Sequence, residues 1–189
     1  MQGPWRAEYG SMHVMTLDAN HVWKASPGCR ILIVDNGAVR FDFPSDWIIH
    51  SGTKQTVLFD RCPPDQQSFF GLRWRRISLQ EAAVSLGCLV AHSSVAEVRP
   101  IVERGPLIRI FRPPLEVAWI QLKVLEGGRE VCTRLCVARG GCTQAIIVAE
   151  FGSVDELRFF SVWETLMRTL AVGDYIADPL TGRRYEQRG

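Results

Sequence analysis

The six cysteines of this 189-residue chain are the side chains best suited to bind a metal or to act as nucleophiles. Cys132, Cys136 and Cys142 lie close together in the sequence. In a strand that covers residues 130–138, Cys132 and Cys136 are about 13 Å apart, at about 3.3 Å per residue. Two thiolates that share one zinc ion must lie within about 4 Å of each other. The chain has no Cys-x-x-Cys pair, so we expect no metal site and interpret these cysteines as small core side chains.

Cys88 and His92 stand four residues apart in a predicted helix, which places them on neighbouring turns. The geometry allows a nucleophile-and-base pair. The sequence shows no oxyanion-hole loop and no third member, and the motifs for dinucleotide, P-loop and esterase sites are absent. A buried cysteine and a histidine near the helix C-terminus are the simpler interpretation. We therefore expect no catalytic residue and no cofactor, with a hydrolase-like enzyme using Cys88 as an alternative.

Arginine supplies almost all of the positive charge, since the sequence has only three lysines, Lys24, Lys54 and Lys123. The arginines gather in two predicted strand regions: Arg73, Arg75 and Arg76 in one, and Arg104, Arg109 and Arg112 in the other. Guanidinium groups suit the recognition of carboxylates and phosphates and the packing of interfaces. If the two strands are neighbours, Arg73, Arg75 and Arg109 form a patch for an acidic partner or an anionic ligand. Ordinary surface charge is the alternative.

The composition is that of a globular protein, with 47% hydrophobic and 22% charged residues. The net charge of +2 gives no basic excess, so we expect no nucleic acid as partner. No apolar run approaches the roughly 20 residues that cross a membrane, and the first residues do not resemble a secretory signal. We expect a cytoplasmic protein with reduced thiols.

Alternating apolar residues predict the first strands. A strand at residues 29–35 is followed by Asn36-Gly37, a strong hairpin signal, and by a second strand through Phe43. Pro44 then begins a turn, after which Trp47 and Ile49 share one face of the next strand. Residues 55–60 and 68–77 predict two more strands, joined by a loop.

A helix is expected next, because Ser78 and Glu81 have the spacing of a capping box. Apolar residues then recur at helical spacing: Leu79, Ala82, Ala83, Leu86 and Val90. Residues 93–106 are expected to form a long irregular connection, or a short helix and a loop.

The C-terminal half has the clearest pattern. Four strands are predicted at residues 107–111, 116–125, 130–138 and 142–151, the last three joined by glycine-containing hairpins. A closing helix is expected to begin at Ser153 with Glu156 three residues later. Its predicted apolar stripe contains Leu157, Phe160, Trp163, Leu166, Met167 and Leu170.

Short connections between strands favour antiparallel pairing, and the strand at 116–125 is apolar on both faces, so it needs cover on both. We therefore predict an α+β fold in which a mostly antiparallel sheet is sandwiched between helices in α/β/α layers. The expected organisation is a flexible leader at 1–28, one domain at 29–170 and a tail at 171–189 that wraps back or hangs free.

The opening strands resemble the PsbP-like superfamily, which includes the photosystem protein PsbP, bacterial DcrB-type lipoproteins and a nuclear-import factor that binds the GTPase Ran. An aromatic strand, a proline and a tryptophan carry the resemblance, as Phe41, Phe43, Pro44, Asp46 and Trp47. As a pattern of elements it extends over about residues 30–170. The expected export signal or lipobox is not found, which argues against a photosynthetic role. The resemblance implies a non-catalytic binding or assembly role.

We therefore expect a non-catalytic domain that binds another protein or its own copy, with Trp47 buried beside Phe41 and Phe43. One alternative is a small-molecule or anion-binding sandwich with a pocket between sheet and helices. The other is the enzyme with Cys88. A structure separates them, because an enzyme needs Cys88 to reach both a base and a cavity.

Overall fold

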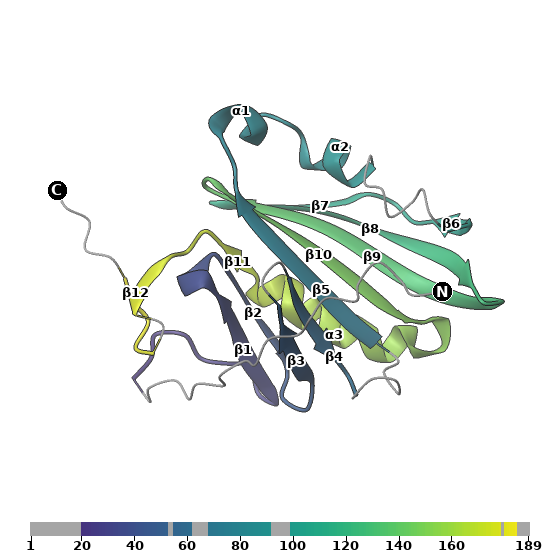
Figure 1. Ribbon diagram of the computed structural model, residues 1–189, viewed down its shortest axis with the longest axis horizontal. Helices are drawn as coiled ribbons and strands as arrows, with labels where there is room; N and C mark the ends of the chain where they lie inside the picture. The colour runs from purple at the N-terminus through teal and green to yellow at the C-terminus, as the bar shows by residue number, and fades with distance from the viewer. Residues whose placement is uncertain (1–19, 53–54, 62–67, 92–98, 179, 185–189) are drawn as a thin grey trace.

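A large antiparallel sheet forms the centre of the computed structural model, which describes residues 20–52, 55–61, 68–91, 99–178 and 180–184. Its eight strands follow the order β3-β4-β5-β10-β9-β8-β6, with β7 also paired with β8 (Figure 1). They are β3 Ile48–Ser51, β4 Thr56–Phe59, β5 Ser68–Arg76, β6 Ile101–Arg104, β7 Ile108–Arg112, β8 Leu115–Glu126, β9 Arg129–Gly140 and β10 Thr143–Gly152. The three longest strands, β8, β9 and β10, are consecutive in the chain, as expected for hairpins.

A smaller sheet of three strands, in the order β1-β2-β11, lies beside the large one (Figure 1). Its members are β1 Cys29–Val34, β2 Val39–Pro44 and β11 Ala171–Val172. The predicted hairpin between β1 and β2 is confirmed, with Val34 opposite Val39. Asn36 and Gly37 in its turn have φ angles of 52° and 98°, which these two residue types adopt at the lowest cost.

Trp47 occupies the position in the core that the sequence predicted. Its ring is buried and stacks on Phe70 with 5.1 Å between ring centres. Phe41 and Phe43 of β2 belong to the same apolar cluster. Pro44 thus ends strand β2, and the turn that follows directs the Trp47 side chain into the apolar cluster shared by the two sheets.

Helix α3, Glu156–Thr169, packs against β2 of the small sheet and closes one face of the large sheet. Trp163 of α3 lies 5.4 Å from Trp119 of β8, and Phe159 stacks at 4.0 Å on Phe151 of β10, between ring centres. Among the described residues no helix is long and apolar enough to cross a membrane; α3 has 14 residues.

Two short helices cover the other face of the large sheet: α1, Leu79–Ala82, and α2, Leu86–Ala91. Leu86 and Val90 of α2 pack on the apolar side chains of β8, β9 and β10 in a second cluster. The sheet therefore has helical cover on both faces. This confirms the predicted α+β class with a mostly antiparallel sheet between helices.

The continuous helix predicted for residues 79–90 is wrong, because the chain breaks into α1 and α2. In an unbroken helix the carbonyls of Glu81, Ala82 and Val84 would accept from amides four residues later. Arg139 of β9 donates hydrogen bonds to all three carbonyls instead. Leu79, predicted to face the core, is exposed at the start of α1.

The apolar stripe predicted for the closing helix is correct in its second half and wrong in its first. Trp163, Leu166, Met167 and Leu170 are buried, but Leu157 and Phe160 are exposed. At 100° per residue, Leu157 lies about 120° around the helix axis from the buried Trp163, so its side chain points away from the core. A 3₁₀ turn, Ser153–Asp155, precedes α3, and Phe159 takes the buried position expected of Phe160.

Residues 101–104 form a strand, β6, where an irregular connection or a short helix was predicted, and residues 92–98 lie outside the described residues.

Segments outside the predicted domain, residues 29–170, also pack on the fold. Of the predicted leader, residues 1–19 lie outside the described residues, and Trp23 is buried under the guanidinium of Arg40 at 4.1 Å. In the predicted tail, β11 pairs with β2, and β12, Ile176–Asp178, pairs with β13, Arg183–Arg184.

Candidate functional site

The three arginines predicted to form a binding patch lie on one face of the large sheet but do not meet. Arg73 and Arg109 occupy the two ends of one cross-strand row: Arg73, Ile146, Val137, Ala118 and Arg109. The predicted patch required β5 and β7 to be neighbours, and three strands separate them. Four strand spacings of about 4.8 Å put the two backbones about 19 Å apart. The single patch is therefore not formed, and a binding role for each arginine stays a prediction.

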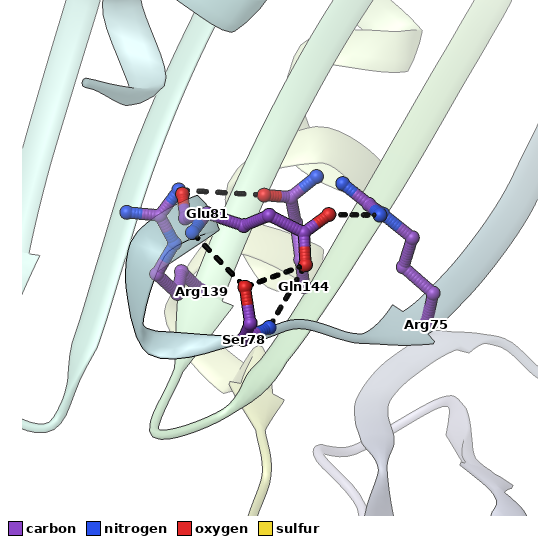
Figure 2. Close-up of polar contacts among 5 residues, drawn as sticks. All are labelled: Arg75, Ser78, Glu81, Arg139 and Gln144. Atoms are coloured by element: carbon purple, nitrogen blue, oxygen red, sulfur yellow. Dashed lines mark hydrogen bonds and ion pairs between the residues drawn. The ribbon is translucent and has the colours of Figure 1, made fainter. Parts of the chain in front are cut away.

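Arg73 and Arg75 have partners within the chain. Arg73 donates from Nε and Nη2 to Oε1 of Gln55, at 3.3 and 3.1 Å. Arg75 donates to Oε1 of Glu81 at 2.5 Å on the exposed surface (Figure 2). Arg109, by contrast, forms no hydrogen bond or ion pair with any residue that the structure describes.

The predicted capping box at the start of α1 is confirmed. Ser78 Oγ accepts from the Glu81 amide at 3.2 Å, and Glu81 Oε2 accepts from the Ser78 amide at 2.9 Å (Figure 2). The Ser78 amide, followed by the Arg75 guanidinium, lowers the pKa of the Glu81 carboxyl. Glu81 thus links the cap of α1 to the side of strand β5.

Arg139 of β9 connects α1 to the large sheet through hydrogen bonds. It is buried and donates to the carbonyls of Ala82 at 2.6 Å, Val84 at 3.1 Å and Glu81 at 3.5 Å. Its Nη2 also lies 3.4 Å from Oε1 of Gln144 on β10 (Figure 2). These groups satisfy the last carbonyls of a very short helix, so the cluster is best understood as structural.

A cleft of about 390 Å³ opens between the α1–α2 connection and strands β7 and β8. Arg109, Phe111 and Glu116 line it, together with the engaged guanidinium of Arg139. Phe111 is 70% exposed. One unengaged guanidinium beside an exposed ring can bind a carboxylate or pack against an aromatic side chain, but it offers no acid–base pair.

A second cleft, of about 700 Å³, lies at the C-terminal end of α3. Its charged lining consists of Lys24, Arg40, Arg112, Arg168, Asp42 and Asp174. Arg112 donates to the carbonyls of Met167 and Arg168, at 2.6 and 2.7 Å, and so caps the negative end of the helix dipole. The buried carboxylate of Asp42 accepts from the amide and hydroxyl of Ser26, both at 2.7 Å. The cleft keeps a positive excess after these contacts.

Arg134 is the most unusual charged residue, since it is only 3% exposed. Four rings surround its guanidinium carbon at 5.2–5.8 Å between carbon and ring centre: Phe151, Trp163, Trp119 and Phe159. Its Nε donates to Gln121 at 2.7 Å, and Gln121 donates to Glu156 at 2.7 Å. Burial lowers the pKa of Arg134, and the negative charge of Glu156 opposes that shift. No described cleft reaches Arg134.

The cysteines show no constellation for chemistry among the described residues. Cys132 and Cys136 are buried on β9, burial raises the pKa of the Cys136 thiol, and no group of three metal-ligating side chains occurs there. Cys88 is exposed on α2 rather than buried, and it lines neither cleft. Its predicted partner, His92, lies outside the described residues.

Three exposed apolar side chains form what we name the α3 strip: Val154 in the 3₁₀ turn before α3, and Leu157 and Phe160 at the start of α3. They are 93%, 91% and 50% exposed. Residues three apart on a helix are neighbours, so these side chains are adjacent on the surface. Single exposed apolar residues are normal, but three that recur every third residue from the 3₁₀ turn into α3 mark a candidate contact surface.

Sequence reasoning missed Arg134 and Arg139, the arginines that are buried among the described residues. A signal was present, because both arginines lie in a strand whose other residues from 131 to 138 are valine, cysteine, threonine, leucine and alanine. In β9, Arg134 shares a face with Cys132 and Cys136, which the sequence assigned to the core. A charged residue on such a face requires buried partners, which the sequence alone does not locate.

The chain resembles the uncharacterized protein alr1449 of the cyanobacterium Nostoc sp. in sequence. The two are 29% identical over 172 residues, which cover 89% of this chain and 90% of the Nostoc protein. The model of the Alr1449 family matches residues 30–176.

Two solved structures share the architecture at very low sequence identity. The cyanobacterial PsbP of Synechocystis sp. has a TM-score of 0.58 at 9% identity, covering 77% of this chain and 92% of its own. LpqN of Mycobacterium tuberculosis, described as involved in cell envelope biogenesis, has a TM-score of 0.53 at 7% identity, covering 76% and 89%. The predicted PsbP-like fold is therefore confirmed, although likeness at this identity extends to fold alone. The chain belongs to the Alr1449 family, with a PsbP-like fold.

Proposed function

We propose that this protein is a non-catalytic domain that binds another protein through the α3 strip. The observation that carries the proposal is the exposure of Val154, Leu157 and Phe160, whereas the other apolar residues of α3 are buried or partly buried. Leaving them in water forgoes burial that is worth roughly 1.5–3 kcal/mol for each large side chain. A partner that covers the strip recovers this free energy, which is the usual role of an exposed apolar patch.

The clefts support a binding role over an enzymatic one. Arg109 and Glu116 both line the cleft beside β7, and its lining contains no cysteine, histidine or lysine. An enzyme of the kind considered from the sequence needs Cys88 and a base at a cavity, and Cys88 lies outside both clefts. The described residues therefore offer surfaces for contact and little for bond chemistry.

The test uses Leu157→Glu and the matched variant Leu79→Glu, which changes another highly exposed leucine, on α1. Both should fold like the natural chain by near-ultraviolet circular dichroism. In affinity purification from the native host, proteins that co-elute with the natural chain should also co-elute with Leu79→Glu and should be lost with Leu157→Glu. Recovery of the same proteins with all three chains would overturn the proposal.

A second candidate function, binding of a small anion, is favoured by the cleft at the end of α3, where four cationic side chains meet two carboxylates. Inorganic phosphate should then raise the melting temperature of the natural chain in a concentration-dependent way. The Lys24→Ala variant, which lacks a cation of the cleft rim, should respond less. Equal shifts for both chains would count against this candidate.

A cytoplasmic location is also proposed. In the part of the chain that the structure describes, none of the cysteines forms a disulfide, and Cys88 and Cys142 are exposed. Cysteine thiols on the protein surface are typical of reducing compartments. Alkylation of thiols in intact cells before lysis should therefore label Cys88 and Cys142, and their protection by a disulfide would contradict the location.

A further inference from the structure

Strand β7 has one edge that pairs with no other strand of the described residues. It pairs with β8 on one side, and no backbone hydrogen bond joins its other side to any described residue. Helix α2 packs mainly on β8 and β9. An uncovered strand edge presents amide and carbonyl groups that can pair with another strand.

The two arginines of β7 do not guard this edge. Arginine or lysine on an edge strand commonly discourages pairing. Here the guanidinium of Arg112 donates to carbonyls at the end of α3, and a Cβ placed on Gly87 of α2 would lie 2.8 Å from Nη2 of Arg109. Both side chains therefore turn back over their own subunit and leave the edge accessible.

We propose that β7 pairs antiparallel with β7 of a second copy of this chain, in a register centred on Ile110. A twofold axis perpendicular to the sheet relates two identical antiparallel strands, so one residue must face its own copy. Centring on Ile110 pairs all of Ile108–Arg112 and joins the two large sheets into one. The proposal rests on residues separate from the α3 strip, so it goes beyond the proposed function and stands independently of it.

The side chains of β7 are complementary to themselves in this register. Arg109 of one copy lies opposite Phe111 of the other, twice in the dimer, because 109 and 111 are equidistant from the axis. Each Phe111, 70% exposed in the single chain, then packs against the methylene stem of Arg109, whose guanidinium stays beside Gly87 of its own chain. On the other face, Ile110 meets Ile110 of the second copy at the axis.

Registers centred on the neighbouring residues, Arg109 and Phe111, are expected to be less stable than the register centred on Ile110. Centring on Arg109 places two guanidinium groups directly opposite each other, which is destabilising. Centring on Phe111 pairs Arg109 with Pro113 of the second copy, and proline has no amide hydrogen to donate. A partner strand of another protein would not be held to the register centred on Ile110.

Cysteine cross-linking tests the register. In a background with serine at positions 62, 88 and 142, Ile110→Cys should form an intermolecular disulfide when a mild oxidant is added, because residues directly opposite have Cα atoms about 4.5–5.5 Å apart. Ile108→Cys is the matched control on the same strand and face. In the dimer, the two cysteines at position 108 should lie about 13 Å apart along the strands and should therefore form no disulfide. Equal cross-linking of both variants, or of neither, would overturn the proposal.

A charge exchange tests the same pairing without covalent chemistry, by sedimentation of the purified full chain over a wide range of concentration. Phe111→Lys should weaken the dimer about tenfold or more, because it opposes Arg109 of the second copy with a like charge. Adding Arg109→Glu to that variant should restore the dimer through two oppositely charged pairs. A natural chain that stays monomeric throughout, or a double variant no better than Phe111→Lys, would refute the proposed dimer.

Discussion

Arg134 shows how a charged side chain is accommodated in an apolar core. Removing a guanidinium from water costs several kcal/mol, which the rings of Trp119 and Trp163 and the hydrogen bond to Gln121 offset. The chain continues through Gln121 to Glu156 on α3, so one arginine connects the sheet with the helix. Its Nη1 has no partner among the described residues, so the compensation is incomplete.

Two replacements of Arg134 should separate the contribution of its volume to stability from the contribution of its charge. Arg134→Ala leaves a void among four rings and should lower the free energy of unfolding by about 3–5 kcal/mol. Arg134→Met keeps most of the volume without the charge and should cost less than half as much. Urea denaturation measures both, with Arg158→Met on the exposed side of α3 as a control that changes stability by less than about 0.5 kcal/mol. Equal losses for alanine and methionine would show that the charge, not the volume, is decisive.

Helix α1 is an element that exists through its contacts with the sheet. A helix of four residues has no stability of its own, because nucleation costs more than a single turn returns. Its capping box satisfies the first amides, and Arg139 satisfies the last carbonyls. The same guanidinium ends α1 and so separates it from α2.

Loss of Arg139 should release α1 while leaving the sheet intact. In Arg139→Gln, amide hydrogen exchange of residues 79–84 should accelerate by about tenfold or more, since the carbonyls lose charge-assisted hydrogen bonds worth about 1.5–3 kcal/mol each. Arg75→Gln, which removes only the exposed ion pair with Glu81, should change exchange little. Unchanged protection of residues 79–84 in Arg139→Gln would show that other contacts hold α1.

At the scale of the whole molecule, segments near both ends complete the fold. Strand β11 closes the small sheet against β2, and Ile176 is fully buried beyond it. The backbones of Gly140 and Val172 approach so closely that a Cβ at position 140 would overlap the Val172 carbonyl. The folded unit therefore includes residues past 170, and the match of the family model to residue 176 agrees with this.

A pair of substitutions in the C-terminal segment tests whether it unfolds with the rest. Ile176→Ala should lower the free energy of unfolding by about 2–4 kcal/mol, because it empties a buried site. Leu180→Ala, four residues later and exposed, should change it by less than about 0.5 kcal/mol. Thermal unfolding by calorimetry measures both, and similar small effects would mean that the segment opens independently of the core.

The sequence was sufficient for the features that depend on neighbours along the chain. Alternation placed most of the strands, Asn36-Gly37 placed the first hairpin, and Ser78 with Glu81 placed a helix start. Proline and tryptophan spacing gave the PsbP-like fold through Pro44 and Trp47, which the structural comparison confirms. These patterns work because turn angles, caps and strand faces are decided within a few residues.

Tertiary structure alone decided which distant groups meet. Strand order separated Arg73 from Arg109, although both point to the same face of the sheet. Arg139 binds carbonyls at the end of α1 and in the connection to α2, where the sequence pattern predicted one continuous helix. The rotation of α3 about its axis exposes Leu157 and buries Phe159. Such outcomes depend on contacts between residues tens of positions apart, whose free energies outweigh local preferences of a few tenths of a kcal/mol per residue. The sequence by itself therefore determined the elements and the class of fold, and the packing of the elements determined which surfaces remain for a partner.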